Sequence, residues 1–145
     1  MSSFINTTVT AIMAALQSAP AVAAQVGRVR LRPLAQSATQ AVVVRPLHTQ
    51  VTEAGLMPGM PISWTSTIAV ECYARSGATL APDVAVDPLI AAVYARLMTD
   101  PTLGGVVLGI QPQEISYDFD ADIDQTTCVT LSFSTRHRAN GATLS

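Results

Sequence analysis

Two periodicities of hydrophobic residues divide this chain into segments that predict helices and segments that predict strands. The first predicted helix lies near the N-terminus, where Ser2 or Ser3 can cap it and Pro20 ends it. Its apolar residues share one face of the helix: Ile5, Val9, Ile12, Met13 and Leu16.

The second predicted helix has the clearest ends. Asp87 is a good N-cap, and Pro88 follows at the first helical position, where the missing N–H costs nothing. Residues 100–101 (Asp-Pro) end the helix, and residues 104–105 (Gly-Gly) turn the chain. The apolar stripe recurs at intervals of three and four residues: Leu89, Ile90, Val93, Leu97 and Met98.

Alternation of apolar and polar residues with a period of two predicts the strands. The clearest spans residues 62–75, and it places these apolar residues on one face: Ile62, Trp64, Ile68, Val70 and Cys72. In the last predicted strand, residues 126–138, Val129, Leu131 and Phe133 point inward. The remaining predicted strands are residues 28–33, 40–45, 106–110 and 114–119.

Residues after the predicted strand 40–45 are expected to end it and to form a loop. Pro46 is expected to stop it, and residues 48–61 are expected to form a flexible loop rich in Gly, Pro and Met. Such a loop exposes Leu56, Met57 and Met60, and exposed Met and Leu side chains usually dock against a partner.

This order of elements predicts an α+β fold with two helices packed on one face of a mostly antiparallel sheet. The expected order is α-β-β-β-α-β-β, with two or three strands after the second helix. We expect residues 1–138 to form a single domain, and residues 139–145 to form a flexible C-terminal tail.

Composition adds the expectation of an oligomer. Of the 145 residues, 49% are hydrophobic and only 12% are charged, and the mean hydropathy is +0.36. Partners are expected to cover part of this apolar surface. The net charge of −2 argues against a general nucleic-acid binder. The N-terminal segment lacks the basic residues of a signal peptide, and no apolar run is long enough to span a membrane.

The basic residues are all arginines, which excludes lysine-dependent chemistry such as a Schiff base. Arg28, Arg30 and Arg32 alternate along one predicted strand face. Without interleaved aromatic residues they are a weak nucleic-acid site, so we expect them to pair with carboxylates of this chain or a neighbour.

The acidic segment DFDADID resembles the start of a calcium loop, with alternating carboxylates at Asp118, Asp120, Asp122 and Asp124. An EF-hand beginning at Asp118 needs Gly at its sixth position and Glu at its twelfth, and this chain has Ile123 and Val129 there. We therefore expect no metal site, and interpret the segment as a solvated turn or as a negative patch on a ring or channel wall.

No catalytic constellation is evident in the sequence. Cys72 lies among the apolar residues of its strand and Cys128 on the polar side of its own, so no disulfide between them is expected. His48 and His137 lack a supporting nucleophile motif. We expect no enzyme activity and no cofactor.

The second half of the chain resembles a known family. AVECYAR on a strand, VDPLIAAVYARLMTDPTLGGVV, an acidic stretch and the closing strand TCVTLSFSTRHRA resemble the tail-terminator, or tail-completion, proteins of long-tailed bacteriophages, in the minor tail protein U group.

This resemblance implies a structural role in the virion. Family members form hexameric rings on the head-proximal end of the tail tube, stop its polymerisation and offer a surface to head or neck proteins. DNA passes through the lumen without specific binding. The implied partners are the chain itself, the major tail tube protein and head-completion, neck or connector proteins. The implied location is the head–tail junction of the virion, after synthesis in the host cytoplasm, with no membrane association.

On this interpretation the subunit or tail-tube interface includes the apolar loop residues Leu56, Met57 and Met60, with Arg28, Arg30 and Arg32 as charge partners. An acidic patch facing the lumen would keep phosphates from binding during DNA passage. The alternatives are another neck or minor tail component, such as a head–tail connector or stopper, or a small host binding domain of the same topology.

Overall fold

A computed structural model describes residues 2–28, 40–55, 57, 59–75, 80–118 and 126–145 of the chain. Its elements, in chain order, are α1 (Phe4–Gln17), β1 (Gln25–Gly27), β2 (Gln40–Glu53), β3 (Pro61–Arg75), α2 (Pro82–Thr99), β4 (Gly109–Asp118) and β5 (Thr126–Asn140).

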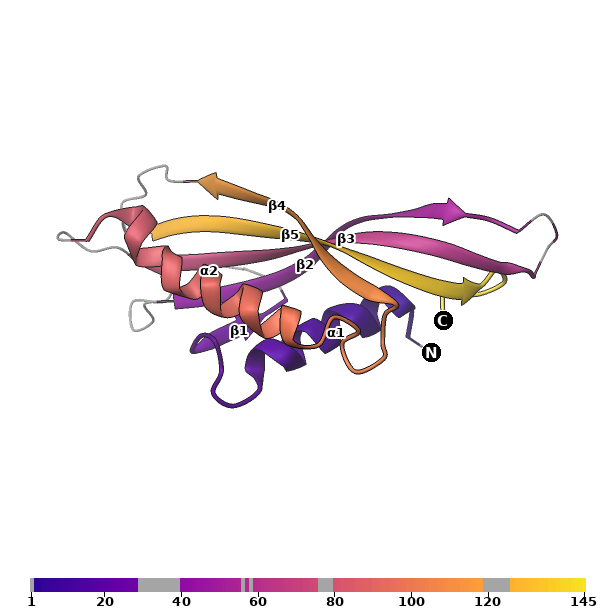
Figure 1. Ribbon diagram of the computed structural model, residues 1–145, viewed down its shortest axis with the longest axis horizontal. Coiled ribbons are helices and arrows are strands. Elements are labelled where there is room, and N and C mark those ends of the chain that lie inside the picture. The colour runs from indigo at the N-terminus through magenta and orange to yellow at the C-terminus, as the bar shows by residue number, and fades with distance from the viewer. Residues whose placement is uncertain (1, 29–39, 56, 58, 76–79, 119–125) are drawn as a thin grey trace.

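Within the described residues, the strands form one five-stranded sheet of order β1-β2-β3-β5-β4. β1 pairs with β2 in parallel, and every other neighbouring pair is antiparallel. Figure 1 shows an elongated molecule in which α1 and α2 lie along the same side of the sheet. The predicted α+β class, element order and placement of both helices on one face are confirmed.

The core lies between this sheet face and the two helices. Each helix buries the apolar stripe that its periodicity predicts, and the strands contribute alternate residues. The members of this core with essentially no exposed surface include Ile12, Leu16, Val44, Ile68, Val70, Leu89, Val93, Leu97, Val129, Leu131 and Phe133. Ser3 caps α1, and its hydroxyl accepts a hydrogen bond from the Asn6 N–H at 3.3 Å.

The start of α2 differs from the prediction. The helix begins at Pro82 with Ala81 as its N-cap, so Pro88 lies inside the helix. Two pairs in this segment have the proline that is typical of a helix start, Ala81-Pro82 and Asp87-Pro88. The helix begins at the earlier pair. The extra turn buries Val86 completely. Burial of this side chain offsets the backbone hydrogen bond that the proline removes.

The prediction that Pro46 stops the second strand is wrong. β2 continues through Pro46 to Glu53, so residues 48–53 are strand and the connecting loop spans only residues 54–60. β1 pairs with β2 only at residues 41–43, which leaves the outer side of Pro46 at a sheet edge. A missing N–H is tolerated there, with a register shift between Pro46 and His48.

The predicted strands over residues 106–110 and 114–119 form one strand, β4, which begins only at Gly109, and residues 101–108 form successive turns instead. Leu103, Gly104 and Gly105 adopt positive φ angles of 52°, 72° and 90°. Two apolar residues of these turns, Leu103 and Val107, are buried in the core, whereas Leu108 is exposed.

The two ends of the sheet region also differ from expectation. The predicted strand at residues 28–33 lies outside the described residues apart from Arg28, and β1 lies just before it. β5 extends to Asn140, two residues beyond the expected end of the domain. Nearer the C-terminus, the Leu144 carbonyl accepts a hydrogen bond of 2.6 Å from the Phe4 N–H. Among the described residues, no helix combines the length and hydrophobicity needed to cross a membrane.

Asp100 ends α2 and organises the turn that follows. Its carboxylate accepts hydrogen bonds from the Thr102 hydroxyl at 2.8 Å and the Gly104 N–H at 2.7 Å. These bonds lower the pKa of Asp100 below its ordinary value of 3.8, and the bond from the Thr102 hydroxyl has the largest effect.

We expect Asp100→Ala to lower the melting temperature at neutral pH, because the folded state then loses the charged acceptor. A depressed carboxyl pKa contributes stability above the ordinary pKa, and this contribution is lost as the pH falls through the folded-state pKa. The difference from the parent should therefore narrow at about pH 3. Thermal denaturation at the two pH values tests this, and an equal difference at both would contradict it.

Candidate assembly surfaces

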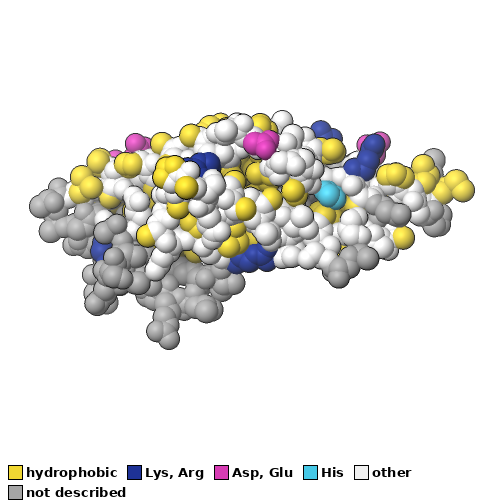
Figure 2. Space-filling model, turned by 90° about the horizontal axis from the view of Figure 1, so that it is seen from below, with side chains coloured by type: hydrophobic (Ala, Val, Ile, Leu, Met, Phe, Trp, Pro, Cys, Tyr) yellow, Lys and Arg dark blue, Asp and Glu magenta, His cyan; other side chains and the backbone are white. Residues whose placement is uncertain are grey.

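One end of the molecule is a projecting hairpin arm, defined here as residues 47–66. It comprises the second half of β2, the first part of β3 and the loop between them. Figure 1 shows this arm extending past both helices at the right of the view. Figure 2 shows hydrophobic side chains gathered at the same narrow end.

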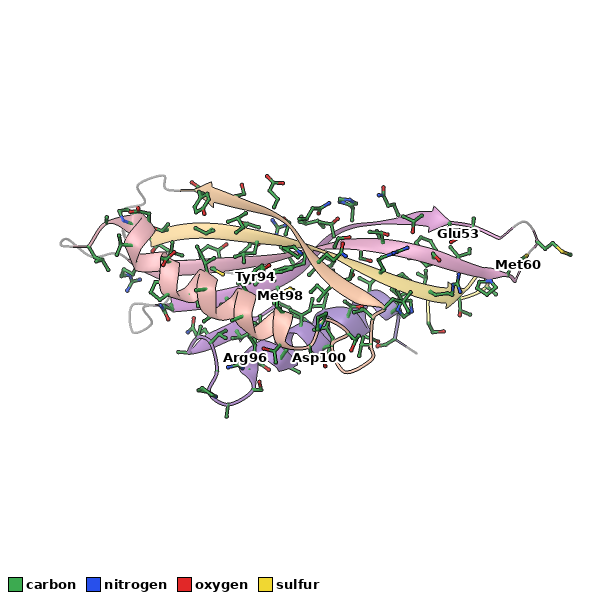
Figure 3. The ribbon with its side chains drawn as sticks, viewed as in Figure 1. Glu53, Met60, Tyr94, Arg96, Met98 and Asp100 are labelled. Carbon is green, nitrogen blue, oxygen red and sulfur yellow. The ribbon has the colours of Figure 1, made fainter. Side chains whose placement is uncertain are left out.

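The arm carries four large apolar side chains with much of their surface exposed. Met57 is 69% exposed and Met60 43%, while Leu47 and Val51 are 44% and 45% exposed. In Figure 3 the Met60 side chain points outward at the tip of the arm. Met57 and Met60 are thus accessible to a partner, while Leu56 lies outside the described residues.

The arm is braced by the rest of the sheet. The first residues of β3 pair with the end of β5, from Pro61 with Asn140 to Ser66 with Thr135. From the α1 side, the Phe4 ring stacks on His137 at a centroid distance of 4.4 Å. An arm held by three strands can present its tip with little loss of conformational entropy on binding.

The predicted arginine group is only partly described. The Arg28 guanidinium donates hydrogen bonds to the Asn6 side-chain oxygen at 2.5 Å and to the Asn6 carbonyl at 3.1 Å. It also bonds the Thr10 hydroxyl, so Arg28 ties the end of β1 to α1. Arg30 and Arg32 lie outside the described residues.

Of the four alternating aspartates, the structure describes only Asp118, the exposed last residue of β4. Asp120, Asp122 and Asp124 lie outside the described residues, so their place on a lumen or surface stays a prediction. Among the residues that are described, no group of three or more His, Cys, Asp or Glu side chains could hold a metal ion.

The sheet face opposite the helices carries a small polar cluster. The Arg45 guanidinium forms an ion pair with Glu71, and the Tyr73 hydroxyl donates a 2.5 Å hydrogen bond to the same carboxylate. Burial, followed by this hydrogen bond, raises the pKa of Tyr73, which therefore stays protonated at neutral pH. The Tyr73 side chain is buried beside Ala41 and Val43, so this polar cluster adjoins a second, smaller group of buried residues on this face of the sheet.

The two cysteines lie on opposite faces of the sheet, as predicted. Cys72 faces the helices, Cys128 pairs with Tyr73 on the other face, and both are free thiols. Burial, with a smaller contribution from Cys128, raises the pKa of Cys72 to about 12. The thiol is therefore protonated at neutral pH and is a poor nucleophile.

A groove of about 720 Å³ lies between the start of α1 and the outer edge of β2, where β1 stops. Its polar lining includes both Arg28 and Arg45, and its apolar lining includes Ile5, Val9 and Val44. Sequence reasoning missed this site because it depends on where β1 ends, and no local pattern signals that point.

Together, the sheet, the helices and the exposed arm define a two-layer α+β protein with its candidate contact surfaces on the sheet edges and the arm. A solved chain with a similar fold belongs to a structure described as the virion of a native gene transfer agent (GTA) particle. The two chains are 12% identical and superpose with a TM-score of 0.53, over 90% of this chain and 93% of that one.

At this level of identity, the likeness establishes the fold alone. No protein-family model matches the chain, and no curated protein sequence matches it.

Proposed function

We propose that this protein is a structural component of a phage-like virion, and more specifically a tail terminator that closes into a ring at the head-proximal end of the tail tube. The observation that carries the proposal is the shared fold with a chain of a virion particle over nearly the full length of both chains. The resemblance of residues 68–138 to tail-terminator proteins supports the specific role.

The physical features of the surface agree with assembly. A ring with closed cyclic symmetry satisfies its own lateral contacts and leaves two different rims, so it can end a stack of tube rings on one rim and meet the neck on the other. The exposed methionines of the arm suit such contacts because their flexible side chains adapt to a partner surface. We place them at the contact with a neighbouring subunit or with the tube.

The role proposed is mechanical, without catalysis. DNA would pass through the lumen without specific binding, and the partners would be the tail tube protein and the head-completion or connector proteins. In this proposal the site consists of contact surfaces, and no residue acts on a substrate.

A second candidate is another neck or minor tail component, such as a head–tail connector or stopper. The likeness to a virion chain favours it equally, since the description of that structure names the particle and no position within it.

The proposal is tested by assembly of the purified protein with purified tail tube protein. We expect light scattering to show a closed oligomer of this chain, and electron microscopy to show tubes of limited length capped at one end by it. Unchanged tube growth in its presence would overturn the terminator role. Binding to a connector ring without any binding to tubes would favour the second candidate.

The double variant Met57→Ser, Met60→Ser should weaken assembly by about tenfold or more while the fold is retained, because two apolar contacts are lost. Light scattering over a concentration series measures the assembly, and circular dichroism checks the fold. Leu108→Ser is a matched control, since Leu108 is 66% exposed but lies away from the arm tip, in the turns before β4. If the control and the double variant assemble equally well, the arm tip is not an interface.

A further inference from the structure

The helices leave one strand of the described sheet uncovered on their own side. α1 packs over β1 and β2, and α2 packs over β3 and β5. β4 follows β5 at the end of the strand order, and all its residues from 111 to 118 are exposed. The helix-side face of β4 therefore remains open beside α2 (Figure 1).

The side of α2 that borders this open face has both apolar and acidic residues. Intervals of three and four residues place Asp83, Asp87, Ile90 and Tyr94 on one stripe of the helix. Tyr94 is 40% exposed, and its ring lies 6.5 Å from that of Phe133 on β5. In Figure 3 Tyr94 points away from α1, which places this stripe on the side of β4.

β4 adds two large apolar side chains to the same surface. Ile115 pairs with Leu131 and Tyr117 pairs with Val129, and both of these partners belong to the core beneath the helices. Directly opposed residues share a sheet face, so Ile115 and Tyr117 lie on the helix side, where they are 42% and 58% exposed. We call this surface the α2–β4 ledge, and define it as Asp83, Asp87, Ile90, Tyr94, Ile115 and Tyr117.

The arm described above is the matching apolar surface at the other end of the molecule. Figure 1 shows the arm at one end of the long axis, and the start of α2 and the end of β4 at the other. The arm exposes Met57 and Met60, and methionine side chains pack favourably against aromatic rings. Because the two surfaces lie at opposite ends of one copy, a contact between them joins two copies.

The arm also carries net positive charge together with the end of β5. Arg136 and Arg138 are exposed on β5, where they pair with Thr65 and Ser63 of the arm. Glu53 is the one acidic residue of the arm, so the two arginines outnumber it. Within the described part of the chain, neither arginine forms an ion pair.

The ledge carries the opposite charge. Asp83 and Asp87 are exposed, and neither forms an ion pair with another described residue. The one basic residue of α2, Arg96, donates its hydrogen bonds to the end of α1, and β4 contains no basic residue. Opposite charges at the margins of two apolar surfaces orient their association and speed it, while the apolar contacts supply most of the affinity.

We propose that the arm of one copy docks on the α2–β4 ledge of the next copy, with Met57 and Met60 against Tyr94 and Ile115. This inference rests on the proposed ring, and it identifies the two surfaces of the lateral contact. Because the surfaces differ, the contact is heterologous and repeats from copy to copy. Such contacts close into a ring when the rotation per copy divides a full turn.

Cross-linking tests the contact directly. In a Cys128→Ser background, Met57→Cys labels the arm and Ala91→Cys labels the ledge, at an exposed position one helical turn from Asp87 and Tyr94. The two proteins are mixed before assembly and treated with a short bis-maleimide. We expect the mixture to give a cross-linked dimer, and each protein alone to give none.

A neighbouring position on the same helix provides the matched control. Ala92 is also exposed, but it lies on the other side of α2, in a hollow that Pro20 lines as well. A mixture of Met57→Cys with Ala92→Cys should therefore give no cross-link. Equal cross-linking of the arm to both helix positions would overturn the inference.

The outcomes separate this inference from the proposed function. A chain carrying both Met57→Cys and Ala91→Cys should give a ladder that ends at the ring size. A ladder that ends at the dimer would support the contact of arm and ledge but overturn the ring. In preparations that light scattering shows to be rings, the absence of this cross-link, or cross-linking of the arm to tube protein instead, would overturn the inference alone. Monomers at all concentrations, with and without tube protein, would overturn both.

Coupling between substitutions provides an independent measurement. Ile115→Ser should weaken association by about tenfold or more. Added to the double variant Met57→Ser, Met60→Ser, it should weaken association by clearly less than the product of the two separate effects, because both remove the same contact. Leu144→Ser is the matched control and should leave association unchanged, because Leu144 is 48% exposed and lies outside the helices and strands. Circular dichroism should be unchanged in all variants. Effects that multiply would show two separate surfaces and overturn the inference.

Discussion

Phe133→Ala should lower the free energy of unfolding by about 4 kcal/mol, the cost of emptying a well-packed site of an aromatic side chain. Phe133 lies on β5 with no exposed surface, opposite Ile68 of β3, and its ring is 6.5 Å from that of Tyr94 on α2. The substitution removes contacts to two strands and a helix at once, and the strands around it cannot collapse into the space.

Urea unfolding monitored by circular dichroism measures this loss in the free energy of unfolding. The protein concentration is kept fixed, because oligomerisation adds to the apparent stability. Phe133→Leu should cost clearly less, since most of the volume is retained. Ser132→Ala, one residue away on the opposite face, should change stability by only about 0.5 kcal/mol. A loss below about 1 kcal/mol for Phe133→Ala would contradict the central packing of this side chain.

Arg96→Ala should lower the free energy of unfolding by about 2 kcal/mol, the range for hydrogen bonds from a charged donor. The Arg96 guanidinium reaches from α2 to the C-terminal end of α1. It donates to the carbonyls of Ala15 at 3.0 Å, Ser18 at 2.8 Å and Pro20 at 2.6 Å, and also to the Ser18 hydroxyl. In Figure 3 Arg96 points to the opposite side of α2 from Tyr94 and Met98, toward α1.

The physical reason is that the last carbonyls of a helix have no partners within it and carry partial negative charge. α1 has no basic residue in its own last turn, so α2 supplies the cation. Arg96→Lys should recover part of the loss, because it keeps the charge but not the planar fork. Arg138→Ala, an exposed arginine on β5, serves as the control and should have little effect.

In Arg96→Ala, faster hydrogen exchange in the last turn of α1 should accompany the lower free energy of unfolding. Stability of the variant equal to that of Arg138→Ala would show that the contact between the helices contributes nothing.

Long-range neighbours explain the errors of the sequence prediction in β2 and α2. Pro46 looks like a strand end because a proline removes a ladder hydrogen bond, but it lies where β1 has already stopped and no described strand needs that bond. Pro88 likewise looks like a helix start. The helix begins earlier in the chain, at Pro82, because Val86 is buried against the sheet. Whether a missing N–H matters depends on what lies beside it, which a local window of sequence does not contain.

The sequence by itself determined the class of the fold, the order of its elements and the inner face of most of them. Periodicity sufficed for this because burial of one face repeats every two residues in β3 and β5 and every three or four in the helices. It also placed Cys72 and Cys128 on opposite faces by parity alone.

Only the tertiary structure decided the partners of Arg28 and Arg96, the burial of the turn around Leu103, and the order of the strands in the described sheet. Each of these depends on segments far apart in the chain meeting in space. An arginine has the same local pattern whether it faces water or a helix end, and a strand has the same alternation at an edge or in the centre of a sheet.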